Sequence, residues 1–165
     1  MILIPASLQA LLAQLTSRQG TPHTSILTSI TSGGSIVSAH TVTNIERPFP
    51  SPFDRTRPRR GRRTTHDDDD DDDQESDEEE SEEEREARIG TYAALALGTW
   101  NEQSDSTRTE DPLMLETEVG RIAVVAVSSF LLILVGTRVT PWKVLDKKVR
   151  AASEYLKEPL SRIST

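Results

Sequence analysis

The sequence has no cysteine among its 165 residues. It therefore offers no disulfide framework, no thiolate nucleophile and no zinc site built on cysteines. Histidine is scarce as well, since His23, His40 and His66 lie far apart in the chain. We expect these imidazoles to be exposed and unpaired rather than to act as metal ligands. The sequence predicts neither a metal site nor a cofactor.

Catalytic motifs are missing too. The sequence contains no Gly-x-x-x-x-Gly-Lys phosphate loop, no His-Glu-x-x-His and no Gly-x-Ser-x-Gly. The pair Gly33-Gly34 is more typical of a hairpin turn than of a phosphate-binding loop. We therefore predict that the protein is not an enzyme.

No apolar stretch has the length of a membrane-spanning helix. Residues 122–136 carry no charge, but they fall short of the roughly 20 residues that a bilayer requires. Ser128 and Ser129 interrupt this stretch, and charged arginines flank it. The chain also opens without the features of a secretory signal and carries no acylation or prenylation motif. We expect a cytoplasmic protein with no direct membrane insertion, and a small membrane protein is the alternative.

Negative charge is concentrated in one segment. The chain has 27 acidic and 19 basic residues, and 15 of the acidic ones fall in the 18 positions from Asp67 to Glu84. Residues 40–86 hold 18 of the acidic and 8 of the basic residues, which leaves 9 acidic and 11 basic residues elsewhere. The part of the chain outside this segment is therefore close to neutral.

Residues 40–86 have the composition of a disordered insertion. Four prolines, a basic run from Arg55 to Arg63 and the acidic tract supply too little apolar surface to offset the entropy of ordering. We predict one domain with ordered parts at about 4–39 and 87–163. A solvated tract is the simpler interpretation, and we expect no nucleic-acid partner. An acidic chaperone or nucleic-acid mimic that acts through the tract is the alternative function.

Two serines lie among these acids. Ser76 and Ser81 each have a carboxylate at the third following position. This spacing resembles the sites of acidophilic casein kinase two. Both serines are therefore possible phosphorylation sites, and a phosphate would add roughly 1.5 to 2 negative charges to each.

Periodicity outlines the remaining elements. Leucines with helical spacing follow Pro5, and a β-hairpin is predicted over 25–30 and 35–39. Apolar stretches at 113–115, 122–127 and 130–135 indicate three more strands. The last helix is expected to take Thr140 as its N-cap and to end at Pro159.

The predicted helix 87–100 has no polar side. One stripe carries large and small apolar residues: Ile89, Tyr92, Ala93, Ala96, Leu97 and Trp100. The opposite stripe is mostly small and consists of Gly90, Thr91, Ala94, Leu95 and Gly98. A helix that is apolar or small all round should be buried on two sides. The sequence therefore predicts that a second protein contacts the small stripe.

The pattern resembles a known family. The stretches SLQALLAQL, SILTSITSGGSIVSA, ARIGTYAALALGTWNE, LMLETEVGRIAVVAVSSFLLILVG and KVLDKKVRAASEYLKEPLSRI are similar to the roadblock (dynein light chain type) family, and more narrowly to its Ragulator branch. EVGRIAVVAV and YLKEPL carry most of the narrower resemblance. In this family the connection before the central helix is short, whereas here it holds residues 40–86.

The resemblance implies a fold and an interface. The fold would be an α/β sandwich with a five-stranded antiparallel sheet, one central helix on one face and two terminal helices on the other. Roadblock chains pair through the central helix and the third strand. The implied interface consists of Gly90, Thr91, Ala94, Leu95, Gly98, Leu113, Met114 and Leu115.

The resemblance also implies a function. It indicates a scaffold subunit of a Ragulator-like (EGO-like) complex on the vacuolar, lysosomal or late endosomal surface, reached through partners. Its partners would be a second roadblock-type subunit, a lipid-anchored scaffold subunit and Rag/Gtr-type GTPases. Such a complex relays amino-acid status to TOR kinase and regulates guanine nucleotide exchange.

Overall fold

The computed structural model describes residues 5–16, 22–42, 81–104, 111–118 and 120–162. Its elements, in chain order, are α1 (Pro5–Leu15), β1 (Thr24–Ser29), β2 (Ile36–Thr41), α2 (Glu82–Ser104), β3 (Leu113–Thr117), β4 (Gly120–Val127), β5 (Phe130–Gly136) and α3 (Trp142–Ser161). The order of helices and strands is the one that the sequence predicts.

The five strands form one antiparallel sheet in the order β2-β1-β5-β4-β3. The uncharged stretch 122–136, for which a membrane span is the alternative, forms the hairpin of β4 and β5. Its turn is Ser128-Ser129, where Ser128 has a φ of 57°. Across the described residues, no helix combines the length and the apolar character needed to cross a bilayer.

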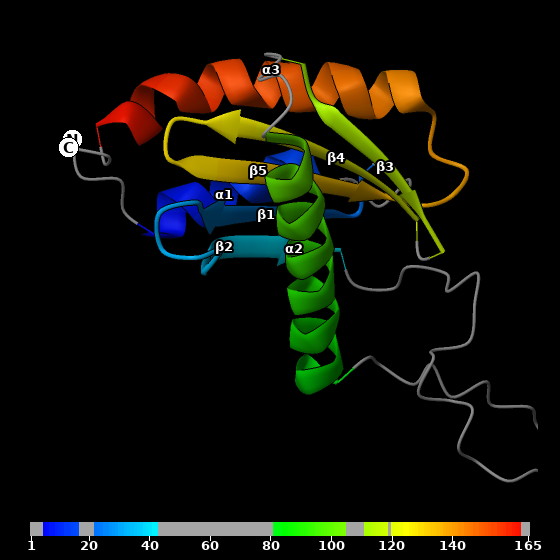
Figure 1. The fold of residues 1–165 in the computed structure, drawn as a ribbon. Helices are drawn as coiled ribbons and strands as arrows, with labels where there is room; N and C mark the ends of the chain where they lie inside the picture. Colours follow the sequence, from blue (N-terminus) through cyan, green and yellow to red (C-terminus); the bar gives the residue numbers. More distant parts are fainter. Residues whose placement is uncertain (1–4, 17–21, 43–80, 105–110, 119, 163–165) are drawn as a thin grey trace, which may run out of the picture.

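Helices cover both faces of the sheet (Figure 1), with α2 on one face and α1 and α3 on the other. Side chains alternate along β4, so that Ile122 and Val124 face α2 while Ala123 and Val125 face α3. Both faces of the central strands are therefore buried, which explains why β4 and β5 have almost continuous apolar sequences. The predicted fold, with one central and two terminal helices on opposite faces, is confirmed.

The central helix is longer than predicted. It begins at Glu82 rather than at Ala87, because Ser81 and Glu84 form a capping box. The Glu84 N–H donates to Ser81 Oγ over 3.2 Å, and the Ser81 N–H donates to a Glu84 carboxylate oxygen over 3.3 Å. At the other side, β2 continues to Thr41. Ordered structure therefore enters the predicted insertion 40–86 from both ends, while its basic run and most of its acidic tract lie outside the described residues.

The ends of the last helix differ from the prediction. Pro141, not Thr140, is the N-cap residue, and no side chain caps the helix there. The Thr140 side chain is instead buried, with its hydroxyl 3.1 Å from that of Thr137. Pro159 does not end the helix, which continues to Ser161. A proline near the last turn removes one backbone donor without interrupting a long run of helical hydrogen bonds.

Candidate interaction surface

The two stripes of α2 differ in burial. Tyr92, Ala93 and Ala96 are buried against the sheet, where they pack with strand residues such as Ile26 and Ile133. Of the five residues predicted for the opposite stripe, Thr91, Ala94, Leu95 and Gly98 are exposed, whereas Gly90 is half-buried. Leu95 is the large apolar residue among them, and 42% of its surface is exposed. The described part of the chain therefore does not cover the small stripe.

The exposed residues continue along the helix in steps of three and four. Glu83, Glu84 and Ala87 precede the small residues on the same side, and Asn101 and Glu102 follow them. We call this line the outer stripe of α2: Glu83, Glu84, Ala87, Thr91, Ala94, Leu95, Gly98, Asn101 and Glu102. A Cβ added at Gly98 would meet nothing within 4 Å. The outer stripe is therefore small and open in its middle and acidic at its ends.

The sheet ends in an edge strand, β3, which pairs only with β4 among the described strands. The pair Thr117 and Gly120 closes a two-residue turn and is therefore a hydrogen-bonded pair. Hydrogen-bonded and non-hydrogen-bonded pairs alternate along an antiparallel ladder, so the N–H and C=O groups of Leu115 and Leu113 also point toward β4. Those of Met114 and Glu116 point away from the sheet. They are available to an added strand.

The predicted interface residues do not all share one face. Leu113 and Leu115 are half-buried on the α2 face of the sheet, near Trp100 of α2. The Met114 side chain packs on the opposite face, toward α1 and α3. Met114 can therefore contribute its backbone to an added strand but not its side chain to a contact with α2.

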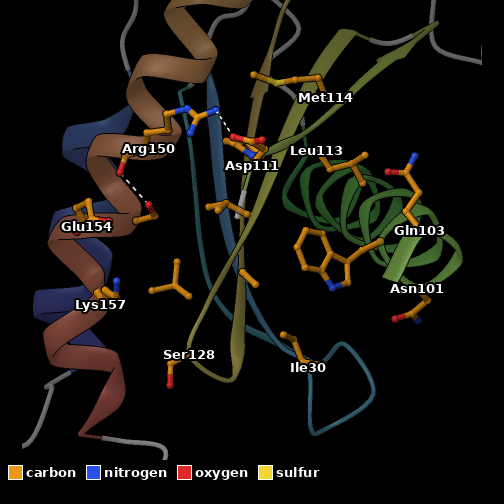
Figure 2. Close-up of a pocket in the computed structure, with 16 residues that line it drawn as sticks. Ile30, Asn101, Gln103, Asp111, Leu113, Met114, Ser128, Arg150, Glu154 and Lys157 are labelled. Carbon is orange, nitrogen blue, oxygen red and sulfur yellow. Dashed lines mark hydrogen bonds and ion pairs between the residues drawn. The ribbon is translucent and has the colours of Figure 1, made fainter. Parts of the chain in front are cut away.

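Beside this edge lies a hollow of about 1060 Å³ (Figure 2). The hollow exists because β3 starts at Leu113, which pairs with Val124, whereas β4 continues beyond Val124 to Val127. Pro112 has no N–H to extend the ladder, and Asp111 accepts a hydrogen bond of 2.9 Å from Arg150 of α3. The hollow extends from Trp100 on α2 to the polar side of α3.

Two of the charged residues at the rim of this hollow, Arg150 and Asp111, form an ion pair. Arg150 contacts both Asp111 and Asp146 at 2.9 Å. The hydrogen bonds that the Arg150 guanidinium donates to Asp111 and Asp146 raise its pKa. Exposed pairs of this kind hold side chains in place and contribute little to stability.

A buried histidine lies where β1 meets α2. His23 is 4% exposed, its Nδ1 is 2.8 Å from the Thr24 hydroxyl, and its ring centroid is 6.3 Å from that of Tyr92. Burial, and then the positive charge of Arg88, lower the pKa of the imidazole to about 4. The expectation of exposed, unpaired histidines is therefore wrong for His23.

The other histidines have different outcomes. His40 is half-buried, and its Nδ1 is 2.9 Å from the Thr16 hydroxyl, so the expectation fails there too. His66 lies outside the described residues. Within the described ranges, no three His, Asp or Glu side chains are grouped as a metal site would require.

The two predicted phosphorylation sites differ in what the structure describes. Ser81 is exposed and is the capping residue of α2, so a phosphate there would lie at the N-terminus of the helix that carries the outer stripe. Ser76 lies outside the described residues.

We compared the sequence and the structure of this chain with those of known proteins. No protein-family model matches the chain, and no curated protein matches it in sequence. Solved structures do match. Myxococcus xanthus MglB, at 11% identity and a TM-score of 0.51, covers 98% of this chain and 92% of its own. An MglB structure described as having a tetrameric arrangement, at 14% identity and a TM-score of 0.52, covers 93% and 88%.

The chain has the roadblock fold. A third match, the Roadblock/LC7 domain from Streptomyces avermitilis, has 13% identity and a TM-score of 0.49 over 93% of this chain and 97% of that one. Within the roadblock fold, the outer stripe of α2 is exposed, and β3 and β2 are the two edge strands of the sheet among the described residues. Ile36 and Val37 of β2 are exposed as well.

Proposed function

We propose that this chain is a non-catalytic scaffold subunit that pairs with a second roadblock-type chain. The observation that carries the proposal is the outer stripe of α2, whose small residues are exposed although the rest of the helix packs on the sheet. Small side chains let another helix approach closely. The β3 edge, with the outward backbone groups of Met114 and Glu116, supports the same contact by strand addition.

We further propose that the pair belongs to a Ragulator-like (EGO-like) complex and holds Rag/Gtr-type GTPases. The support is the sequence resemblance to the Ragulator branch, carried mainly by EVGRIAVVAV and YLKEPL, together with the roadblock fold. In this proposal a lipid-anchored scaffold subunit places the pair on the cytoplasmic side of the vacuolar or lysosomal membrane. The complex then passes amino-acid status to TOR.

Substitution at Gly98 tests the pairing. Because Gly98 is exposed and a Cβ added there meets nothing within 4 Å, Gly98→Arg should leave the fold intact and raise helix propensity by up to about 1 kcal/mol. The same side chain would occupy the space that a partner helix needs. We expect the variant to unfold at an unchanged or higher temperature and to lose its roadblock partner.

The assay is co-expression with roadblock-type chains and small GTPases from the same source, followed by mass measurement of the intact complexes. Ala151→Arg is the matched control, since Ala151 is exposed on α3, on the other side of the sheet. The control should keep every complex that the parent chain forms. A Gly98→Arg chain that binds its partner with unchanged affinity would contradict the proposal.

A further inference from the structure

Exposed carboxylates lie at both ends of the outer stripe of α2. Glu83 and Glu84 precede its small residues and Glu102 follows them, all on the same side of the helix as Gly98. The small middle permits close approach of another helix. Any helix that approaches along this line therefore meets negative charge at both ends, and the charge bears on which chain can pair here.

A second copy of the chain would meet this face in only one orientation. For β3 to pair with β3 of a copy, with both α2 helices on the same face of the joined sheet, the two-fold axis must be normal to the sheet. Such an axis reverses every direction in the plane of the sheet. Both the β3 strands and the α2 helices then run antiparallel. The N-terminal turns of one α2 lie beside the C-terminal turns of the other.

This arrangement brings like charges together. A register that matches Thr91 with Ala94 of the copy and Ala87 with Gly98 of the copy lets the small residues interdigitate. The same register places Glu83 and Glu84 of each chain beside Glu102 of the other, and symmetry repeats the contact. Repulsion between Glu102 of one chain and Glu83 and Glu84 of the other disfavours the pair, and this repulsion weakens as the salt concentration rises.

The β3 edge does not compensate for this repulsion. Its outward backbone groups belong to Met114 and Glu116, and any extended strand can bond to them. If Leu115 faces Leu115 of a copy, Glu116 faces Met114 rather than another acid. The strand edge is therefore indifferent to the identity of the partner, and selection falls to α2.

We propose that this surface selects a roadblock-type chain whose central helix carries lysine or arginine opposite Glu83, Glu84 and Glu102, and that it disfavours a second copy of this chain. The inference rests on the proposed function. Complementary charge at the two ends of the helix pair would steer the partner into register, while the small residues supply the close contact. The same carboxylates act against self-pairing.

The chain itself is the probe that tests this selection. In the antiparallel arrangement, Glu102→Lys places a cation beside Glu83 and Glu84 of the other copy, twice in each dimer. We expect the dimer dissociation constant of the full-length chain to fall about tenfold at low salt, and by less at physiological salt. Adding Glu83→Lys in the same chain leaves the capping box of Ser81 and Glu84 intact, places two cations side by side and should reduce the gain. Sedimentation equilibrium measures all of these constants.

The matched control is Glu154→Lys. Glu154 is exposed on α3, and its substitution changes the net charge by the same amount without touching the outer stripe. We expect it to leave self-association as in the parent chain. The inference is overturned if the parent chain dimerises as tightly as the Glu102→Lys chain, if Glu102→Lys gives no gain, or if Glu154→Lys gives an equal one.

A further variant separates this inference from the function on which it rests. Gly98→Arg, added to Glu102→Lys, should abolish the new dimer. If that dimer persists, the contact does not use the outer stripe, and the pairing surface itself is refuted. If Gly98→Arg removes the natural partner while Glu102→Lys leaves self-association unchanged, the proposed function stands and only the selection by charge is refuted.

Discussion

Acidification should destabilise this domain through His23. The imidazole is 4% exposed, and burial together with Arg88 lowers its pKa from 6.5 to about 4. Above pH 6.5 the imidazole is neutral in both the folded and the unfolded chain, so its contribution does not change. Between pH 6.5 and 4 the unfolded chain takes up a proton that the folded chain excludes, and the free energy of unfolding falls.

The size of the loss follows from the shift in pKa. Each pKa unit corresponds to 1.36 kcal/mol, so a shift from 6.5 to about 4 amounts to about 3 kcal/mol over the whole window. Below pH 4 the folded chain is protonated too, and this contribution stops changing. A loss of about 3 kcal/mol is a large fraction of the 5 to 15 kcal/mol typical of a small domain.

Urea denaturation of the full-length chain at pH 7.5, 5.5 and 4.5 measures the effect, with His23→Gln as the variant that cannot titrate. Carboxylates also titrate in part of this range, so the decisive quantity is the difference between the parent and the variant at each pH. We expect this difference to change by about 2 to 3 kcal/mol from pH 7.5 to 4.5. His40→Gln leaves His23 in place and should retain the dependence of the parent chain. If the parent and His23→Gln lose stability in parallel, His23 is not responsible.

Two further predictions concern the entry into α2. Ser81→Ala removes the side-chain acceptor of the capping box and should cost about 1 kcal/mol of local stability. We expect faster hydrogen exchange in the first turn of α2, with Ser153→Ala on α3 as the control. Unchanged exchange would contradict this prediction. Replacing residues 43–80 by a short Gly/Ser linker should preserve folding and pairing, because β2 ends at Thr41 and the cap of α2 begins at Ser81. Closing a longer flexible loop costs only about 0.6 kcal/mol more for each doubling of its length. Thermal unfolding and partner affinity at physiological salt test this, and lost binding by an intact fold would favour an acidic-tract function instead.

Much of the fold could be predicted from the sequence because its signals are local. The continuous apolar runs of β4 and β5, the helical spacing of Leu145, Val149 and Leu156, and the turn at Gly33-Gly34 each reflect a few neighbouring residues. The outer stripe of α2 is visible for the same reason, since its spacing of three and four places small residues on one side. The division of α2 into a side that packs on the sheet and an opposite side with small residues therefore follows from periodicity alone.

The features that could not be predicted depend on tertiary contacts or on competing local patterns. His23 is buried because β1 lies between β2 and β5 with α2 above it, and nothing near residue 23 in the sequence indicates that position. The composition of residues 82–86 is that of the acidic tract, so composition predicts a later start of α2 than the structure shows. The Ser-x-x-Glu pattern at Ser81 is the local signal for the true start.

The composition of the outer stripe explains how one surface can be both exposed and suited to pairing. Glycine, alanine and threonine present little apolar area, so the free chain exposes Leu95 but no large apolar patch along this line. The hydrophobic gain on pairing is correspondingly modest, and close packing of the backbones must supply much of the contact. Close packing requires correct register, which small side chains alone specify weakly. The carboxylates at the two ends of α2 fix the register of the helix pair, because a shift by one helical turn would move each carboxylate away from an opposite charge on the partner. In this arrangement the middle of α2 provides proximity and its ends provide selection.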